Sequence, residues 1–503
     1  SAVSNLRVGS LTISGLVQLA GENVGNSLTV KGDLIGAGGT VAINTVLGND
    51  ASATDKLILD GGKTTGTTSL AVFNNGGAGA KTDIGIEVVD AINGAITENG
   101  SFTLSSQSTG YRSTTGTLAI GAYDYGLVRG GKGGDAESWY LSSTSTEAED
   151  GNEGNEGDDD KGGDDDNNNN SNAGLRPEAG VYAGNMLAAQ SMFEMTLHDR
   201  ESYNRSTGQN GVEDEHASWA RVTGSHSSGK MANGALSNSA DISSVQMGVD
   251  LLSKPDTQFG SVYAGVMGGW GSAKTYAKKD QGNHIHADGS VSGYSAGVYG
   301  TWYEKDKDLG GAYVDSWMQH NWFDNSVHGF GLPEESYGSQ MDTVSVETGY
   351  AIKLSDDENT KIFVEPQGQL KYSSYRSDNH TEVGGTKVST EDAEGVTARA
   401  GARLYGVHTL KGGQTIRPFV EVNYWYTQNT GTVVMNDDAI KSGAPKSYGE
   451  VKAGIVSDVT RNLQVTTQVG GQSGDNDFTS VSGQIGIKYS WYSHFVLSGT
   501  VPG

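Results

Sequence analysis

The stretch SVSGQIGIKYSW, residues 480–491, alternates apolar or aromatic side chains with polar ones at every second position. Successive side chains of a β-strand point to opposite faces, so this period of two predicts a strand with one apolar side. Val481, Ile485 and Ile487 lie on the apolar side, and Lys488 lies on the other. The fold depends on what the apolar side touches.

The same alternation recurs from His216 to Trp491, in segments separated by polar or glycine-rich turns. Twelve such segments can be marked. They lie near 218–225, 244–252, 261–276, 289–303, 311–329, 341–354, 362–378, 396–408, 415–434, 448–460, 462–474 and 479–491. An even number of amphipathic strands, joined by short and long polar loops, is typical of a transmembrane antiparallel β-barrel.

Alternation alone does not separate a membrane barrel from a soluble β-sandwich, whose outer faces also meet water. Charges of both signs on the polar face and aromatic residues near strand ends favour the barrel, with a wet lumen and membrane girdles. The expected lumen residues are Arg221, Glu347, Glu365, Arg399, Arg403, Glu421 and Lys488. The expected girdle residues are Trp302, Tyr303, Tyr372, Tyr426, Tyr489 and Trp491.

The composition fits a β protein of many short strands and turns, because 75 of the 503 residues are glycine. The chain has no cysteine, which excludes disulfide bonds, cysteine metal sites and thiol catalysis. No apolar run approaches the roughly 20 residues of a membrane-spanning helix, so a membrane-spanning form must be a barrel. The net charge of −26 argues against nucleic acid as a partner.

Residues 1–143 contain short apolar alternations at nearly regular spacing, each ended by Gly or Asn. Such a pattern suggests a solenoid or a sandwich, and we prefer the C-terminal rungs of a right-handed parallel β-helix. A solenoid needs a cap at its open end, and the aromatic-rich stretch 121–143 is expected to provide one.

Residues 144–172 carry almost no apolar side chains, and eleven acidic residues with one lysine lie between Glu147 and Asp166. Such a segment cannot repay the entropy of ordering, so we predict a disordered acidic linker. A calcium site is the alternative, but the spacing lacks both the EF-hand pattern and a nine-residue repeat.

Residues 175–200 show near-helical spacing of apolar side chains, with Pro177 near the start, and predict one helix. This helix either packs on a core or threads a pore. In the second case the lumen charges are expected to hold it and to set the polarity of the pore. Plain water-facing residues are the alternative for these charges.

Six quoted segments together resemble classical bacterial autotransporters, the type V secretion proteins. GAYDYGLV (121–128) and SWYLSS (138–143) resemble the autochaperone junction, and NMLAAQSMFEMTLHDR (185–200) resembles the pore helix. The remaining segments resemble the first, a middle and the last barrel strand; they are SWARVTG (218–224), VEPQGQLKY (364–372) and GQIGIKYSW (483–491). The region before the junction is similar to passengers of the diffuse-adherence adhesin type.

The resemblance implies an outer-membrane translocator that exports its own passenger, here an adhesin fragment, with the junction seeding passenger folding. The expected divisions are passenger 1–143, linker 144–172, pore helix 173–212, barrel 213–491 and tail 492–503. The tail departs from the family, whose barrels end on an aromatic residue, so it is expected to be an added segment or part of an unusual last strand. Implied partners are outer-membrane lipid, the barrel-insertion machinery with periplasmic chaperones, and host or neighbouring cell surfaces.

No catalytic site or cofactor is expected. Relatives of the diffuse-adherence type are cleaved upstream of the junction with help from acidic residues, which makes Asp33, Asp50 and Asp55 weak candidates for self-cleavage. Turn capping is the favoured interpretation of these three residues. Asn185 lacks the second asparagine of members that cut inside the pore helix. His284 and His286 imply no third metal ligand.

Two other functions stay open. One is a self-cleaving or enzymatic passenger with protease or esterase activity, although no G-x-S-x-G elbow occurs in strand-turn-helix context. The other is a diffusion porin, against which the pore helix and the long N-terminal region argue.

Overall fold

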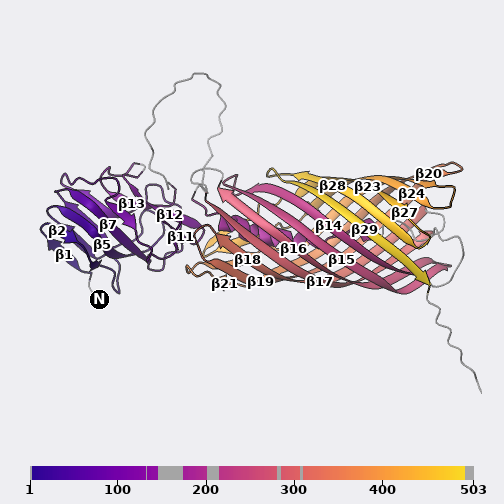
Figure 1. Cartoon of the computed structure of the whole chain (residues 1–503), viewed down its shortest axis with the longest axis horizontal. Helices are drawn as coiled ribbons and strands as arrows, with labels where there is room; N and C mark the ends of the chain where they lie inside the picture. Colours follow the sequence, from indigo (N-terminus) through magenta and orange to yellow (C-terminus); the bar gives the residue numbers. More distant parts are fainter. Residues whose placement is uncertain are drawn as a thin grey trace, which may run out of the picture.

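The computed structural model describes residues 3–131, 133–144, 174–200, 215–279, 285–305 and 310–492. Two β units follow one another along the long axis of the molecule (Figure 1). We call them the solenoid, residues 3–144, and the barrel, residues 215–492. The expected linker and tail lie outside the described residues, apart from Thr144 and Tyr492.

In the solenoid, strands from successive turns of the chain pair in parallel within two sheets. One sheet has the order β1-β4-β6-β8, and the other has the order β2-β5-β7-β9 with β3 also paired to β5. Leu28 pairs with Leu57, and Leu57 with Val89, so each turn lies on the one before. All three side chains belong to one buried core. This parallel stacking is the arrangement expected of β-helix rungs. The strands are β1 (Asn5–Val8), β2 (Leu11–Ile13), β3 (Leu16–Gln18), β4 (Ser27–Val30), β5 (Leu34–Thr45), β6 (Lys56–Asp60), β7 (Thr64–Asn74), β8 (Ile86–Ile92) and β9 (Phe102–Leu104).

Antiparallel strands finish the solenoid on the side of the barrel, and we call them the cap. They continue the first sheet in the order β8-β13-β12-β11-β10. Tyr125 is fully buried there; its hydroxyl donates to the Gly48 carbonyl at 2.7 Å and accepts from the Ala80 N–H at 2.8 Å. Burial raises the pKa of this hydroxyl. The cap strands are β10 (Tyr111–Arg112), β11 (Thr117–Ile120), β12 (Tyr123–Arg129) and β13 (Trp139–Ser142).

Twelve antiparallel strands close into the barrel, which confirms the predicted fold class and strand number. The last strand pairs with the first along a seam from Glu215↔Tyr492 to Ser228↔Thr479. The strands are β14 (Glu215–Met231), β15 (Leu236–Thr257), β16 (Gly260–Lys279), β17 (His286–Lys305), β18 (Gly310–Gly329), β19 (Glu334–Asp356), β20 (Thr360–Ser377), β23 (Glu394–Thr409), β24 (Thr415–Thr427), β27 (Ser447–Asp458), β28 (Leu463–Gly474) and β29 (Thr479–Tyr492).

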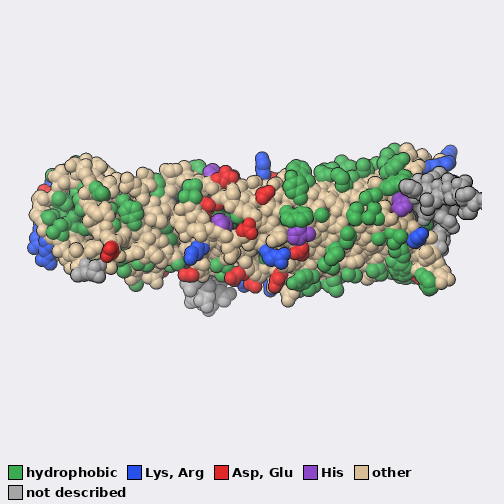
Figure 2. All heavy atoms as spheres, turned by 90° about the horizontal axis from the view of Figure 1, so that it is seen from below, with side chains coloured by type: hydrophobic (Ala, Val, Ile, Leu, Met, Phe, Trp, Pro, Cys, Tyr) green, Lys and Arg blue, Asp and Glu red, His purple; other side chains and the backbone are tan. Residues whose placement is uncertain are grey.

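The apolar side of the barrel strands faces outward. On β19 the Val346 side chain is 51% exposed and its neighbour Glu347 is 1% exposed; on β29 the values are 58% for Ile485 and 6% for Gln484. Figure 2 shows apolar side chains gathered over the half of the barrel distant from the solenoid, and charged ones nearer the solenoid. In the stretch 480–491, the apolar side chains therefore face outward, whereas Gln484 and Lys488 face the lumen.

A small sheet of four strands stands at the barrel end next to the solenoid, and we call it the mouth sheet. It has the order β21-β22-β25-β26, built from β21 (His380–Thr381), β22 (Lys387–Glu391), β25 (Thr432–Met435) and β26 (Asp438–Lys441). The predicted single strand 415–434 is wrong, because β24 ends at Thr427 and the chain then leaves the barrel wall to pair in this sheet.

Two helices fill the lumen: α1 (Glu178–Ser191) and α2 (Leu197–Arg200). We call residues 178–200 the plug. The prediction of one continuous helix over 175–200 is wrong, since residues 192–196 interrupt it. Among the described residues, no helix is long and apolar enough to cross a membrane.

Candidate functional site within the barrel

Helix α1 lies against one wall of the barrel, formed by β15 to β18. Gly180 permits this approach, because a Cβ atom there would lie 2.6 Å from the Cβ of Ala277 on β16. Further along, Phe193 stacks on Phe323 of β18 with ring centroids 6.1 Å apart. Small and apolar side chains thus fix the side on which the helix rests.

Asn185, in the middle of α1, is fully buried and bonded to two strands. Its side-chain amide donates to the Ser326 carbonyl at 2.9 Å, and its oxygen accepts from the Thr275 hydroxyl at 2.6 Å. A buried amide without partners is costly, so these bonds favour one depth of the helix in the lumen.

The interruption between α1 and α2 has its cause in the barrel wall. The Phe193 carbonyl accepts from the Gln319 amide at 3.0 Å, and the Glu194 carbonyl accepts from the Arg221 guanidinium at 2.6 Å. The Met195 carbonyl likewise accepts from Gln369 at 3.2 Å. Side chains from three strands thus satisfy the carbonyls that a continuing helix would have bonded itself.

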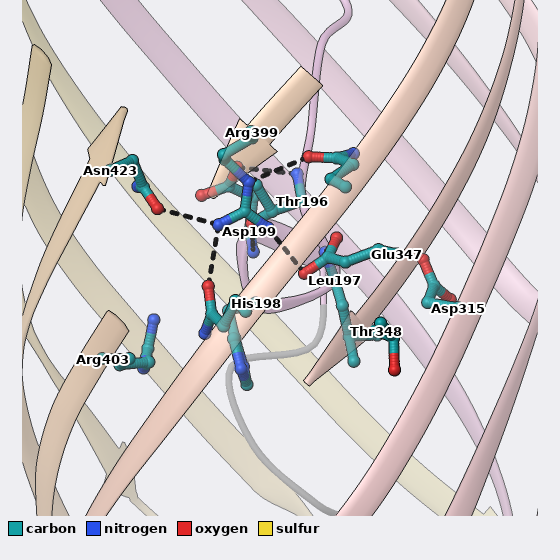
Figure 3. A network of polar contacts seen from close by, with 12 residues as sticks. Thr196, Leu197, His198, Asp199, Asp315, Glu347, Thr348, Arg399, Arg403 and Asn423 are labelled. Carbon is teal, nitrogen blue, oxygen red and sulfur yellow. Dashed lines mark hydrogen bonds and ion pairs between the residues drawn. The ribbon is translucent and has the colours of Figure 1, made fainter. Parts of the chain in front are cut away.

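Arg399 on β23 lies at the centre of the polar network (Figure 3). Its guanidinium donates to Glu347 at 2.8 Å, Gln367 at 2.8 Å and Asn423 at 2.9 Å. Glu347 in turn accepts the backbone N–H of Leu197, the first residue of α2, at 2.8 Å. A carboxylate at this end of the helix satisfies one of its free N–H groups, so the network holds the plug.

Each ionisable residue of α2 has a partner on the wall. His198 contacts Glu365 at 2.6 Å, and Asp199 contacts Lys452 at 3.1 and 3.2 Å. The third, Arg200, pairs with Asp315 at 2.5 Å. Removing one partner of a buried ion pair typically costs about 3–5 kcal/mol, so these contacts strongly disfavour plug displacement.

The seven predicted lumen residues are all buried and point inward. Three of them, Arg221, Glu347 and Glu365, contact the plug directly. Arg399 acts through Glu347, and Arg403 pairs with Glu421 at 3.0 Å on the wall itself. Lys488 lies near the far end of β29 and is also buried.

Asp315, Asp199 and Arg200 belong to the network but are not among the predicted lumen residues. Asp315 occupies an inward position of β18, and the alternation of that strand could have revealed it. No periodic pattern predicts the direction of the Asp199 and Arg200 side chains, because both residues follow the interruption of the helix. Only the structure places them opposite Lys452 and Asp315.

Five of the six predicted girdle residues lie on the outward face. Tyr372, Tyr426 and Tyr489 are about half exposed, and Trp302 and Trp491 are partly exposed. The sixth assignment, Tyr303, is wrong: this side chain faces the lumen and packs with Leu197, Tyr263 and Tyr313. The reason is that Trp302 and Tyr303 are adjacent on one strand and cannot share a face.

A further row of outward aromatic residues crosses three neighbouring strands. Trp270 on β16 pairs with Tyr294 on β17, which pairs with Trp322 on β18. Beyond this row, toward the solenoid, the outer face carries exposed pairs of ionisable side chains, such as His226 with Asp241 at 2.7 Å. The row therefore marks the boundary at which the apolar band ends.

Asp33, Asp50 and Asp55 bind backbone N–H groups of neighbouring turns of the solenoid. Asp55 accepts from Gly25, Asn26 and Asn44, and Asp50 accepts from residues 83 to 85. Asp33 accepts the N–H of Lys63 at 3.0 Å. All three carboxylates therefore bond the backbone of neighbouring turns, which is the kind of contact that the turn-capping interpretation expects.

In the described part of the chain, no group of three or more His, Asp or Glu residues is placed to hold a metal ion. His286 packs against Phe330 with ring centroids 4.7 Å apart, and His284 lies outside the described residues.

A cavity of about 350 Å³ runs beside α1, and residues of β14, β15 and β29 are part of its lining. Small polar residues line its outer wall, including Ser225 on β14 and Ser482 on β29. Its lining includes Asp199 of α2 and two of the wall residues that bond it, Lys452 and Gln484. The plug thus leaves a space beside the seam of the barrel.

Comparison with known families gives two matches. Residues 218–470 match the family described as the autotransporter beta-domain, and residues 1–127 match the one described as autochaperone domain type 1.

Curated relatives cover most of the chain. The Escherichia coli K12 protein YdeU is 34% identical, over 94% of this chain and 99% of its own length. YuaQ from the same strain is 34% identical over 96% of this chain, and the Escherichia coli autotransporter adhesin AIDA-I is 30% identical over 93%. The chain spans about a third of the length of YuaQ and of AIDA-I, 34% in each case.

One solved structure resembles the barrel region. It is the crystal structure of the transport unit of AIDA-I from Escherichia coli, which is 31% identical with a TM-score of 0.55. The match covers 63% of this chain and all of that one.

Proposed function

Because the chain belongs to the autotransporter family, we propose that its barrel exports its own N-terminal passenger, of which the solenoid is a part. The barrel lies in the outer membrane, with the solenoid at the cell surface. One observation carries the proposal: the chain that leaves the solenoid passes down the lumen as the plug before it enters the wall at β14 (Figure 1).

The two ends of the plug lie near opposite ends of the barrel. Tyr182 near the start of α1 bonds Glu382 of the mouth sheet region, and Arg200 at the end of α2 bonds Thr301 near the opposite end of β17. The plug therefore runs through most of the barrel length. Such a path is what remains when a chain has been drawn through a pore from one side to the other.

Loop lengths support the assignment of sides. The turns at the barrel end distant from the solenoid are short, such as 357–359 and 459–462. Those at the solenoid end reach 378–393 and 428–446. Outer-membrane barrels have short periplasmic turns and longer extracellular loops, so this comparison supports an extracellular solenoid.

Passenger folding can supply the direction of export. Each turn of the solenoid buries apolar residues only against its neighbours, so an emerging chain gains stability turn by turn. The cap is the part nearest the barrel, and its buried residues include Leu118 and Tyr125. We propose that it folds first at the surface and seeds the turns before it.

We propose that the passenger is an adhesin, which contacts host or neighbouring cells, and that it performs no catalysis. AIDA-I and a Brucella suis relative are both described as adhesins. The three aspartates considered for self-cleavage are engaged with backbone N–H groups, which supports their structural use. The barrel-insertion machinery and periplasmic chaperones are the expected partners during assembly.

Single cysteines can test export, because the chain has none of its own. Thr65→Cys lies on an exposed part of the solenoid, and Glu358→Cys lies in a short turn at the far end of the barrel. A membrane-impermeant maleimide added to intact cells should label Thr65→Cys and leave Glu358→Cys unlabelled until the cells are broken. The reverse pattern, or labelling of neither on intact cells, would contradict the proposal.

A further inference from the structure

The end of the cap at Ser143 and the start of the segment that leads into the plug, at Gly174, lie next to each other. A side chain on Gly174 would collide with the Ser143 carbonyl, 2.2 Å from the ideal Cβ position. Leu175 then bridges to Tyr123 of the cap, and the Arg176 N–H donates to the Ala122 carbonyl at 2.8 Å. The residues that lead into the plug are thus packed on the cap itself.

We propose that the cap docks on the mouth of the barrel through an interface that persists without the covalent connection through residues 145–173, and that Arg112 is its central residue. This proposal concerns the assembled molecule and does not depend on how the passenger reached the surface.

Arg112, on the first cap strand, is 0% exposed and bonds groups from three parts of the chain. Its guanidinium contacts Asp124 within the cap at 3.0 Å and Glu178, the first residue of α1, at 2.8 Å. It also donates to the Phe330 carbonyl, in the loop after β18, at 2.9 Å. One cap residue therefore joins the cap, the plug and the barrel rim.

The loops of the mouth sheet make a second set of contacts, with the cap and with the solenoid turn between β7 and β8. The Gly121 N–H donates to the Thr386 hydroxyl at 3.0 Å, and the Asn436 amide donates to the Ala78 carbonyl at 2.9 Å. Arg176 bridges the two sides, since it pairs with Glu382 and donates to the Gly121 carbonyl at 2.8 Å. These bonds surround the Arg112 site.

Glycines on the rim allow the close approach. Gly331 has φ +77° and accepts the Ser113 N–H at 3.0 Å; a Cβ there would lie 2.4 Å from the Thr114 hydroxyl. At Gly329 a Cβ would lie 1.9 Å from a Glu178 carboxylate oxygen. A side chain at Gly331 would also meet the Thr114 backbone nitrogen, 2.8 Å from the ideal Cβ position, and one at Gly329 would displace the Glu178 carboxylate that Arg112 binds.

An unbroken apolar core underlies the polar contacts. One cluster of buried side chains includes Ile120 and Tyr123 of the cap, Val181 of α1, and Val433 and Met435 of the mouth sheet. Burial on this scale is typical of a folded unit and contrasts with the more polar contacts between loosely tethered domains. The docked cap should therefore stay in place when the chain is cut beside it.

The test uses the purified full chain in detergent, with a protease recognition sequence inserted between Gly162 and Gly163. After cutting, the solenoid and barrel fragments should co-elute in gel filtration at 150 mM salt. In Arg112→Met the buried carboxylates lose their cation, and we expect the dissociated fraction to rise at least tenfold. Dissociation of the unmutated fragments, or equal retention in Arg112→Met, would overturn the proposal.

Lys56→Met is the matched control, because Lys56 pairs with Glu87 within the solenoid at 2.6 Å and does not touch the barrel. It should not change co-elution. Arg112→Met could fail through misfolding of the cap, so Gly331→Ala carries the same test from the barrel side. A heat-modifiable barrel and a protease-resistant solenoid must be seen in each variant that dissociates; dissociation of Gly331→Ala in that state supports docking, and its full retention contradicts it.

Discussion

The ammonium group of Lys452 on β27 lies 3.1 and 3.2 Å from the two carboxylate oxygens of Asp199 on α2. This ion pair joins the last helical turn of the plug to the wall beside the seam. Gln468 adds a bond to the same carboxylate at 2.8 Å. The plug is thereby tied at its far end to the wall that α1 does not touch.

Replacing Lys452 by Met should weaken the plug while leaving the barrel closed. Asp199 would keep the Gln468 bond but lose its cation, at a cost of about 3–5 kcal/mol in holding the plug. We expect more frequent and larger conductance steps in planar bilayers than for the unmutated chain.

Lys353→Met removes an exposed pair with Asp356 and serves as the control. Its conductance should match that of the unmutated protein. A Lys452→Met channel as quiet as the control would show that α2 is held by other contacts.

Arg399→Met should lower the temperature at which the barrel unfolds in heat-modifiability gels. The variant leaves Glu347 and the amide oxygens around it without their common donor, which costs more than a surface change. Arg376→Met, which breaks an outer-face pair with Asp342 at 2.7 Å, should have little effect because exposed pairs contribute roughly 0–1 kcal/mol. Equal shifts in the two variants would argue against a stabilising network in the lumen.

The boundary of the apolar band can be mapped along one strand. Ser336 and Val346 both face outward on β19, the first on the solenoid side of the aromatic row and the second within the apolar band. On intact cells an impermeant maleimide should label Ser336→Cys and should not label Val346→Cys. Labelling of both would place the membrane elsewhere.

Tyr125→Phe should destabilise the cap by about 1–3 kcal/mol, because the buried Gly48 carbonyl and Ala80 N–H would lose a bonding partner. Pulse proteolysis in urea, read on the solenoid, measures the change. Tyr294→Phe on the outer face of the barrel is the control and should leave the solenoid midpoint unchanged.

The stability of the solenoid should fall in acid partly through Glu137. The Thr97 N–H and the Arg129 guanidinium bond its carboxylate and lower its pKa below the usual 4.5. A group with a lowered folded-state pKa contributes stability above its unfolded pKa and loses that contribution as the pH falls through the folded value. Glu137→Gln should flatten the decline of the urea midpoint below about pH 4.5; an unchanged decline would assign it to other carboxylates.

The alternation of apolar and polar residues predicts the barrel because each side chain of the wall faces one of only two environments, the apolar surroundings or the polar lumen. That is why all seven predicted lumen residues are buried, although their partners could not be named. Tyr303 differs from the girdle prediction because it follows Trp302 directly on β17, and adjacent residues of a strand point to opposite faces.

Parts of the structure that depend on contacts between distant segments were not predictable in this way. At the interruption of the plug, the backbone carbonyls are bonded by Gln319, Arg221 and Gln369, which lie on three different strands. The mouth sheet joins two separate loops. The role of Arg112 depends on its bonds to Glu178 and to the Phe330 carbonyl, which lies more than two hundred residues away in the sequence. Pairings of this kind leave no local period in the sequence.

The near-contact of Ser143 with Gly174 makes this point of the chain a natural place to carry cargo. A foreign domain whose own ends lie close together could be grafted between them without stretching the host on either side. Such a graft would lie beside the junction of the solenoid with the barrel and would leave the parallel turns of the solenoid uncovered.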